Sequence, residues 1–335
     1  MTKNRNMKDK IASKLNIIPI LIVLISGVGI FTGIGIMLIL RFYEKLNEEN
    51  DFTWSNIIFP FFIFLFVFYT IYYLLTNFPK ITIDKSGIKF STFLKTEFYP
   101  WNEIEKIKIT GKEYLTFLIS SMPMEATAIN LKNGNNKIIW ADNYINTSEL
   151  RVIFERAEKI ITENKSEMNS LDFKINNTKN ITKESDFRNE TEFNGNHILS
   201  VNGIMFYGFL IFVLFMIFQK PNEIVEKIDK IFFISIIGLI LCSLFSYQMN
   251  YFIVTDKLII VKNTIWFWIN KVYLIEDIKE IVIEQPHKSS ISLRIITNDF
   301  NSKIYKAGSL RDKTWTKLKE NLIQKKLNIR NETHN

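Results

Sequence analysis

Four uncharged apolar segments constrain this chain more than any other feature of its sequence. They occupy Ile17–Leu40, Asn56–Leu75, Ile198–Phe218 and Ile231–Tyr251, and none contains Asp, Glu, Lys, Arg or His. A helix needs about 20 mostly apolar residues to cross the ~30 Å hydrocarbon core of a bilayer. A soluble helix of that length would carry charge on its solvent face. We therefore expect four transmembrane helices in two hairpins, over residues 17–76 and 198–251.

A polar stretch with β-strand patterning follows each apolar pair, so the chain reads as two copies of one design. The first copy, residues 80–165, opens with two alternating segments around a turn at Asp84–Gly87 and closes with a helix capped by Thr147 or Ser148. The second copy, residues 252–330, follows the same order and closes with a helix that begins near Ser309. This pattern predicts a membrane α+β protein in which each hairpin precedes a small, curved antiparallel sheet plugged by a C-terminal helix, a unit that we call a barrel.

Three remaining segments are polar and poor in apolar residues. Residues 1–16 form a basic tail, and residues 166–196 are rich in Asn, Thr, Lys and Glu. Such a composition buries too little apolar surface to fold alone, which predicts a flexible linker between the copies. We also expect the first 14 residues and the tail after Leu327 to be loosely ordered.

The distribution of basic residues predicts which side of the membrane each part faces. The loop Arg41–Ser55 has only two basic residues among four acidic ones, whereas the N-terminal tail carries Lys3, Arg5, Lys8, Lys10 and Lys14. Basic flanking segments stay in the cytoplasm. Because each hairpin crosses twice, we expect the N-terminus and both soluble domains on the cytoplasmic side of the membrane.

Composition excludes several other classes of protein. The net charge of +8 has no clustered arginine stripe, so we expect a lipid bilayer and not a nucleic acid as partner. The one cysteine, Cys242, permits neither an intrachain disulfide nor a zinc cluster. His197, His287 and His334 lie far apart, and no metalloprotease, phosphate-loop or nucleophile-elbow motif is present. We expect no cofactor, no metal and no catalytic residues.

A few residues are candidates for packing or lipid contact. Gly29 and Gly33 have the small-xxx-small spacing that lets membrane helices approach closely, within the chain or between chains. Trp101 is expected to cover an edge of the first barrel, and Trp315 to plug the second from its closing helix. Basic side chains near the second barrel's mouth would meet anionic lipid headgroups, each worth about 1 kcal/mol; they are Lys257, Lys262 and Lys271.

Four short segments resemble one bacterial family. They are Tyr251–Val261 (YFIVTDKLIIV), Val272–Ile281 (VYLIEDIKEI), Ile81–Ile88 (ITIDKSGI) and Trp101–Ile107 (WNEIEKI). The first two are similar to the pleckstrin-homology-like, membrane-flanked domain, and the other two resemble a related single-hairpin variant, so that the chain would hold two tandem copies. Because this family is bacterial, we expect the membrane to be the bacterial cytoplasmic (inner) membrane. The resemblance implies two seven-stranded, helix-capped barrels, without an assigned reaction. The second copy has Asn263-Thr264 after its second strand, where the family usually has a glycine.

These observations lead to two functional hypotheses. The first is a non-enzymatic membrane protein that presents two cytoplasmic domains to a protein or lipid partner, in envelope stress or resistance to membrane-active peptides. The alternative is an accessory or core subunit of a transport or export system. That alternative is disfavoured because the apolar segments lack the ionisable residues on which coupled transport usually depends.

Overall fold

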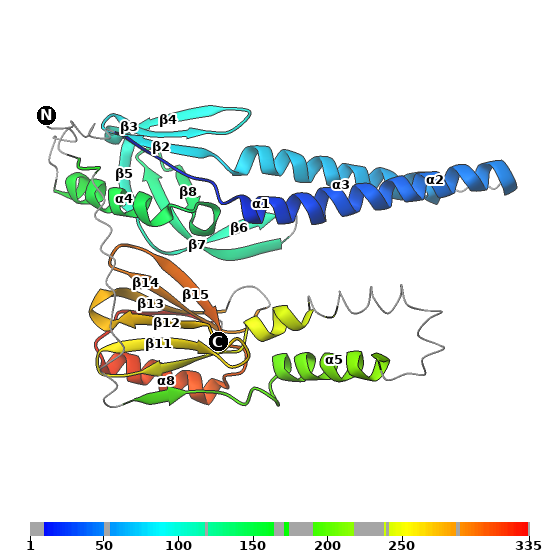
Figure 1. Ribbon diagram of the computed structural model, residues 1–335. Helices are drawn as coiled ribbons and strands as arrows, with labels where there is room; N and C mark the ends of the chain where they lie inside the picture. The colour runs from blue at the N-terminus through cyan, green and yellow to red at the C-terminus, as the bar shows by residue number, and fades with distance from the viewer. Residues whose placement is uncertain are drawn as a thin grey trace, which may run out of the picture. The chain divides into compact units, whose positions relative to one another are not determined.

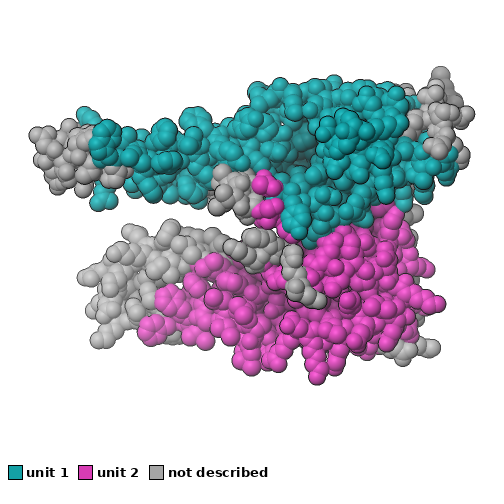
Figure 2. All heavy atoms as spheres, turned by 180° about the vertical axis from the view of Figure 1, so that it is seen from behind, with its two compact units in different colours: residues 1–115, 124–176 teal, residues 116–123, 177–335 magenta. Residues whose placement is uncertain are grey.

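The computed structural model describes residues 10–49, 54–117, 120–163, 171–173, 190–217, 238, 241–285 and 289–333. These residues divide into two compact units, which are coloured separately in Figure 2. Unit 1 comprises Met1–Leu115 and Met124–Asn176, and unit 2 comprises Thr116–Pro123 and Asn177–Asn335. Each unit contains apolar helices, strands and one amphipathic helix.

The apolar helices of unit 1 form a long hairpin that projects from the strands (Figure 1). Its first arm consists of α1 (Ile17–Val23), a π-helical segment (Leu24–Ile30) and α2 (Phe31–Glu49). The second arm is α3 (Ser55–Asn77). Gly35 of α2 faces Phe64 of α3, which brings the two arms into direct contact.

The first sheet of unit 1 has the strand order β1-β2-β3-β4. The strands are β1 (Lys10–Ala12), β2 (Lys80–Asp84), β3 (Gly87–Ser91) and β4 (Thr96–Pro100), and neighbours are antiparallel. The predicted hairpin around Asp84–Gly87 is confirmed, since Ile83 pairs with Ile88 and Ile81 with Phe90. Asp84 accepts hydrogen bonds from the amides of Ser86 and Gly87, which fixes the turn.

The second sheet of unit 1 is built around one long strand, β7 (Ser120–Leu131). Its neighbours are β5 (Ile104–Lys108), β6 (Lys112–Phe117) and β8 (Asn136–Trp140). The helix α4 (Thr147–Thr162) buries Leu150, Ile153 and Phe154 in the core that both sheets share. The predicted closing helix is therefore present, although its N-cap is Asn146.

Unit 2 repeats this order with its own two sheets. The first has the order β12-β11-β10-β9, and the second β15-β14-β13-β16. The helix α8 (Asp312–Gln324) buries Trp315, Leu318 and Leu322 in the core of the unit. The remaining elements are α5 (Val201–Ile217), β9 (Thr191–Phe193), β10 (Asn250–Val254), β11 (Leu258–Asn263), β12 (Asn270–Leu274), β13 (Ile278–Glu284), β14 (Ser292–Thr297), β15 (Ser302–Lys306) and β16 (Ile329–Glu332).

The expectation of four transmembrane helices followed by two barrels is wrong. In the described ranges, only the windows Gly27–Glu44 and Ile57–Asn77 are long and apolar enough to cross a membrane. The apolar part of α5 is shorter, and at 1.5 Å per residue it falls short of the ~30 Å hydrocarbon core. Residues 231–237, 239 and 240 of the fourth apolar segment lie outside the described residues, and Asn250 and Tyr251 at its end belong to β10. The strands form four four-stranded sheets, in a mixed α and β architecture.

Strands also occur where loose segments were expected. β1 lies in the basic tail, β9 in the expected linker 166–196, and β16 follows Leu327 and pairs in parallel with β13. β1 precedes the helices of unit 1 and pairs with β2, the first strand after them. β9 precedes α5 and pairs with β10 in the same way. In each unit, therefore, the chain leaves the first sheet for its apolar segment and returns to the neighbouring strand.

Candidate membrane interface

The helical hairpin of unit 1 carries most of its apolar side chains on its surface. Along α3 these include Phe59, Phe61, Phe62, Leu65 and Phe68. An apolar helix in the core of a soluble protein would be mostly buried, but few residues of either window are buried. Contiguous exposed apolar surface of this extent is costly in water and marks a surface that another apolar phase covers. The hairpin is therefore the best candidate in unit 1 for contact with lipid.

Two glycines bring the arms of this hairpin together. A Cβ atom added to Gly27 would lie 3.2 Å from Thr70 Cγ2, and one added to Gly35 would lie 3.0 Å from the ring of Phe64. The hydroxyl of Thr70 donates to the Phe66 carbonyl at 2.9 Å, so this buried polar group is satisfied within α3. The contact between the arms thus depends on small residues, as is usual for membrane helices.

The predicted glycines, Gly29 and Gly33, make no such contact with α3. A Cβ atom added to Gly29 would lie 3.7 Å from the Leu24 carbonyl oxygen, in the same arm. A Cβ atom added to Gly33 would meet no described atom within 4 Å beyond its chain neighbours and the backbone of its own helix. Both glycines are exposed. A role for them in contacts between chains stays a prediction.

The loop between β11 and β12 of unit 2, Thr264–Ile269, exposes an uncharged aromatic cluster. Phe267 is 82% exposed and Trp268 61% exposed, and their ring centroids lie 4.9 Å apart. Trp266 anchors the loop, because its indole N–H donates to Ser246 Oγ at 2.8 Å. Ser246 belongs to the helical segment 241–247, so this loop is fixed to the end of the apolar segment that leads into β10. We call Thr264–Ile269 the unit 2 tip.

The loop between β3 and β4 of unit 1 has the same character. Thr92–Lys95, which we call the unit 1 tip, is a tight turn closed by the Thr92 amide and the Lys95 carbonyl at 2.8 Å. Phe93 is 82% exposed and Leu94 56% exposed. The neighbouring strand residue Ser91 pairs with Lys80, close to the C-terminal end of α3. Both tips therefore lie at the end of their sheet where the chain emerges from an apolar helix.

Positive charge accompanies the unit 1 tip. Lys95 Nζ lies 2.9 Å from one oxygen of Glu97, and Lys137 Nζ lies 2.7 Å from the other. Hydrogen bonds from Lys137 and then Lys95 lower the pKa of Glu97 to about 2, so this carboxylate stays charged at neutral pH. Two lysines around one carboxylate leave this cluster with a net charge of +1.

The predicted lipid-contact lysines do not form one cluster. Lys262 and Lys271 lie beside the unit 2 tip, on β11 and β12, but on opposite faces, since Lys262 pairs with Asn270 and Lys271 with Val261. Lys257 lies at the other end of β11, in the turn after β10, where its carbonyl accepts from the Ile275 amide. Only Lys262 and Lys271 are therefore placed to act together with the tip.

The two predicted packing tryptophans are both buried. Trp315, on α8, lies 5.8 Å from Phe252 between ring centroids and is part of the core of unit 2. Trp101 belongs to the short 3₁₀ turn Trp101–Glu103 between β4 and β5. Its indole N–H donates to the Asp84 carbonyl at 3.0 Å, which connects this turn to the end of β2.

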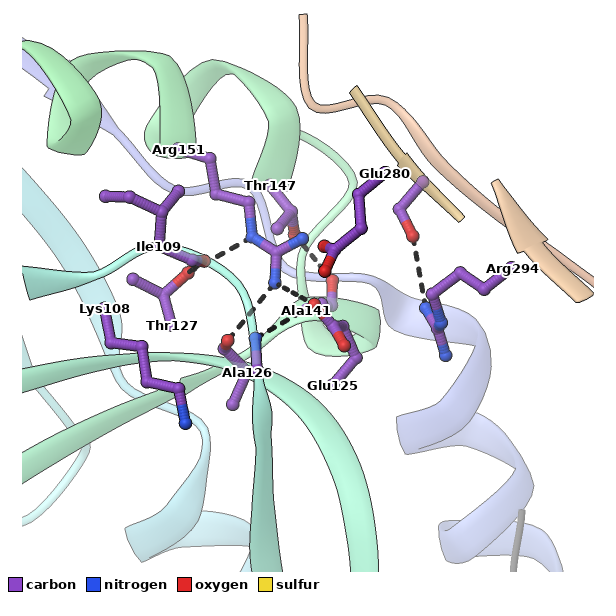
Figure 3. A network of polar contacts seen from close by, with 12 residues as sticks. Lys108, Ile109, Glu125, Ala126, Thr127, Ala141, Thr147, Arg151, Glu280 and Arg294 are labelled. Carbon is purple, nitrogen blue, oxygen red and sulfur yellow. Dashed lines mark hydrogen bonds and ion pairs between the residues drawn. The ribbon is translucent and has the colours of Figure 1, made fainter. Parts of the chain in front are cut away.

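Each unit also contains a buried arginine–glutamate pair that the sequence analysis missed. In unit 1, Arg151 of α4 points towards β7 (Figure 3). Its Nη2 atom lies 3.1 Å from Glu125 Oε1 and 3.3 Å from the Ala126 carbonyl, and its Nε donates to Thr127 Oγ1 at 3.2 Å. The side chains of Arg151 and Glu125 are both 0% exposed. This network holds α4 against the long strand.

The equivalent pair in unit 2 connects two strands. Arg294 Nε of β14 lies 3.0 Å from Glu284 Oε1 of β13, and Arg294 Nη1 donates to Ser302 Oγ of β15. In both pairs the arginine connects its own element to a neighbouring strand within the protein interior, so the geometry supports a structural role. The available sequence signal was Arg151 itself, which directly follows Leu150 of the apolar stripe of α4.

The described ranges hold no group of three or more His, Cys, Asp or Glu side chains that could bind a metal ion. Of the three histidines, His197 lies within them, whereas His287 and His334 lie outside the described residues. The chain matches no family model and no curated protein. Its function must therefore be argued from the helical hairpin, the tips and the strand pairing.

Proposed function

We propose that this chain is a membrane-anchored binding protein of the bacterial cytoplasmic membrane, without a catalytic role. The α2–α3 hairpin would anchor unit 1 in the bilayer, and the sheets of both units would bind a protein or lipid partner at its cytoplasmic surface. The observation that carries this proposal is the exposed apolar surface of α2 and α3. In water that surface would promote aggregation, whereas in a bilayer it is solvated.

The strand pairing supports placing the tail and the sheets on the same side. β1 and β2 are hydrogen-bonded neighbours, so the segment between them must begin and end in one aqueous compartment. The basic residues of the tail favour the cytoplasm. Resistance to membrane-active peptides or envelope stress is the proposed context.

The alternative of a transport subunit requires polar groups along the contact between helices. The described contact between the two arms instead includes Gly27, Gly35, phenylalanines and Thr70, whose hydroxyl is bonded within its own helix. No observation favours a substrate path there, so we propose the binding role alone.

The test begins with extraction of cell membranes at alkaline pH, which removes peripheral proteins. We expect the full-length chain to stay in the pellet until detergent is added. The double variant Phe62→Lys/Phe68→Lys, which places two charges on the exposed face of α3, should reduce the membrane fraction strongly, because each charge costs about 3 kcal/mol at the centre of a spanning helix. The matched control, Phe62→Leu/Phe68→Leu, should leave it unchanged.

Crosslinking in native membranes then identifies the partner. The proposal predicts a protein or lipid adduct on the sheets of the wild-type chain and of the leucine control. Recovery of the wild-type chain in the alkaline supernatant would contradict the anchor. Turnover of a small substrate by the purified chain would contradict the non-catalytic role.

A further inference from the structure

We propose that the two tips are interfacial anchors that insert into the same bilayer as the apolar helices and hold each first sheet against the membrane surface. The inference rests on the proposed membrane anchoring and adds a second lipid-binding element to it. It commits to lipid as the occupant of Phe93 and Leu94 in unit 1 and of Phe267 and Trp268 in unit 2.

The first argument is the chemistry of the tips. Each presents two large apolar side chains that are more than half exposed, although the cores of both units are well filled. Apart from Lys95, the last residue of the unit 1 tip, neither tip contains a charged residue. Trp concentrates at the boundary between acyl chains and headgroups, because its ring is apolar and its N–H is polar, and Phe and Leu form the buried side of elements that lie in this interface. A basic rim of Lys95 and Lys137 in unit 1, and of Lys262 and Lys271 in unit 2, suits anionic headgroups.

The second argument is position. In unit 2 the loop is bonded directly to the chain that leaves the apolar helix: the Thr264 amide donates to the Met249 carbonyl at 3.0 Å, and the Asn263 side chain donates to the Ser246 carbonyl at 3.1 Å. In unit 1, Ser91 pairs with Lys80, three residues after α3 ends at Asn77. The unit 1 tip thus lies beside the point where the proposed anchor leaves the bilayer, and the unit 2 tip lies beside the end of an apolar helix of its own unit. A protein partner would have no reason to require that position in both units.

The third argument is repetition. Both tips connect the second and third strands that follow the apolar segment, β3 to β4 and β11 to β12. Their sequences, Thr92-Phe93-Leu94-Lys95 and Thr264-Ile265-Trp266-Phe267-Trp268-Ile269, differ in length and residues. The two loops therefore share exposure and position but little sequence, which fits selection for an apolar surface at one depth.

The experiment measures the depth of single labelled sites in vesicles of phosphatidylethanolamine and phosphatidylglycerol. In a Cys242→Ser background, Phe93→Cys and Phe267→Cys carry an environment-sensitive fluorophore, and nitroxide-labelled lipids quench it. Matched controls are Lys85→Cys and Lys257→Cys, which are exposed in the turns at the opposite ends of β3 and β11. At about 3.3 Å per residue, a five-residue strand separates tip and turn by roughly 17 Å.

We expect a nitroxide near the top of the acyl chain to quench both tip probes at least about twofold more than the turn probes, because only the tips reach that depth. A fifth probe, Phe62→Cys on α3, reports on the anchor itself and should respond to a deep nitroxide. If this probe responds and the tips do not exceed the turns, the tip inference is overturned while the anchor stands. If this probe fails to respond, the anchor fails.

Two further outcomes identify another occupant and overturn the inference. Tip probes that are shielded from lipid but self-quench as the protein-to-lipid ratio rises would indicate a second copy of the chain. Tip probes that stay fully exposed to water in vesicles, and become protected only in native membranes, would indicate a protein partner. For a final test, the unit 2 probe is attached at Ile269→Cys. The added double variant Phe267→Ser/Trp268→Ser should expose this probe to water, while leaving the Phe62→Cys signal unchanged.

Discussion

At the residue scale, the buried pair Arg151–Glu125 makes the sharpest prediction about stability. Arg151→Met leaves the Glu125 carboxylate without its cation in a site that water does not reach. Breaking a buried pair from one side costs about 3–5 kcal/mol, whereas removing both charges is often close to neutral. We therefore expect Arg151→Met to destabilise unit 1 by that amount, and Glu125→Met/Arg151→Met to recover most of the loss.

Urea-dependent pulse proteolysis of the purified chain in detergent measures the free energy of unfolding of these variants. The matched control is Arg156→Met on the same helix, whose side chain is 35% exposed and lies 3.9 Å from Asp172. A partly exposed pair of this kind is worth less than about 1 kcal/mol. Equal losses at Arg151 and Arg156 would show that the buried network does not stabilise α4 against β7.

At the scale of elements, the contact between α2 and α3 predicts different outcomes for substitutions of Gly35 and Gly33, two glycines on α2. Gly35→Leu inserts a side chain where even a Cβ atom would lie 3.0 Å from the Phe64 ring, so the arms must move apart at a cost of about 1–3 kcal/mol. Gly33→Leu meets no described atom within 4 Å and should be tolerated. The rate of disulfide formation between Phe31→Cys and Phe66→Cys, in a Cys242→Ser background, reports the distance between the arms. The parent ring centroids lie 4.8 Å apart.

We expect Gly35→Leu to slow this crosslink and Gly33→Leu to leave its rate unchanged. If Gly33→Leu slowed the crosslink instead, the contact with α3 would lie on the face of Gly29 and Gly33, which the small-xxx-small spacing predicted. An effect of Gly33→Leu on crosslinks between copies alone would support its proposed role between chains.

The same helices show why part of the fold could be predicted and part could not. The β2–β3 hairpin was predictable because strands and turn lie within one short stretch and Asp84 fixes the turn locally. The helix face that contacts α3 was not predictable. The π-helical segment Leu24–Ile30 has more residues per turn than an α-helix, so it rotates the face that later residues present to α3. Gly27 and Gly35 consequently reach α3.

Long-range pairing explains the other differences. β1 and β9 contain three residues each, and their partners lie beyond an entire apolar segment, so no local pattern announces them. The tips could have been noticed as uncharged aromatic residues between two strands, but only the fold shows that both lie beside the end of an apolar helix. The buried Arg151 was hidden because arginine usually marks the solvent face of a helix.

At the scale of the whole molecule, the two pairings β1–β2 and β9–β10 make a prediction about topology. Each pairing requires any part of the segment between its strands that enters a membrane to leave it through the same surface. We therefore expect the exposed turns of both units to face the cytoplasm, and the C-terminal end of α2 with the connection to α3 to face outwards. The reporters, in a Cys242→Ser background, are Asn133→Cys in unit 1, Asp299→Cys in unit 2 and Glu44→Cys near the outer end of α2.

A membrane-impermeant maleimide added to intact spheroplasts should label Glu44→Cys at once, and Asn133→Cys and Asp299→Cys only after lysis. The control for access is complete labelling of all three variants in detergent. Labelling of Asn133→Cys from outside would place unit 1 in the wrong compartment and remove the basis for cytoplasmic binding. Labelling of Asp299→Cys but not of Asn133→Cys from outside would mean that the chain crosses the bilayer an odd number of times between the two units. Because β9 pairs with β10, the segment between these two strands cannot account for an odd number of crossings. The additional crossing would then lie before β9.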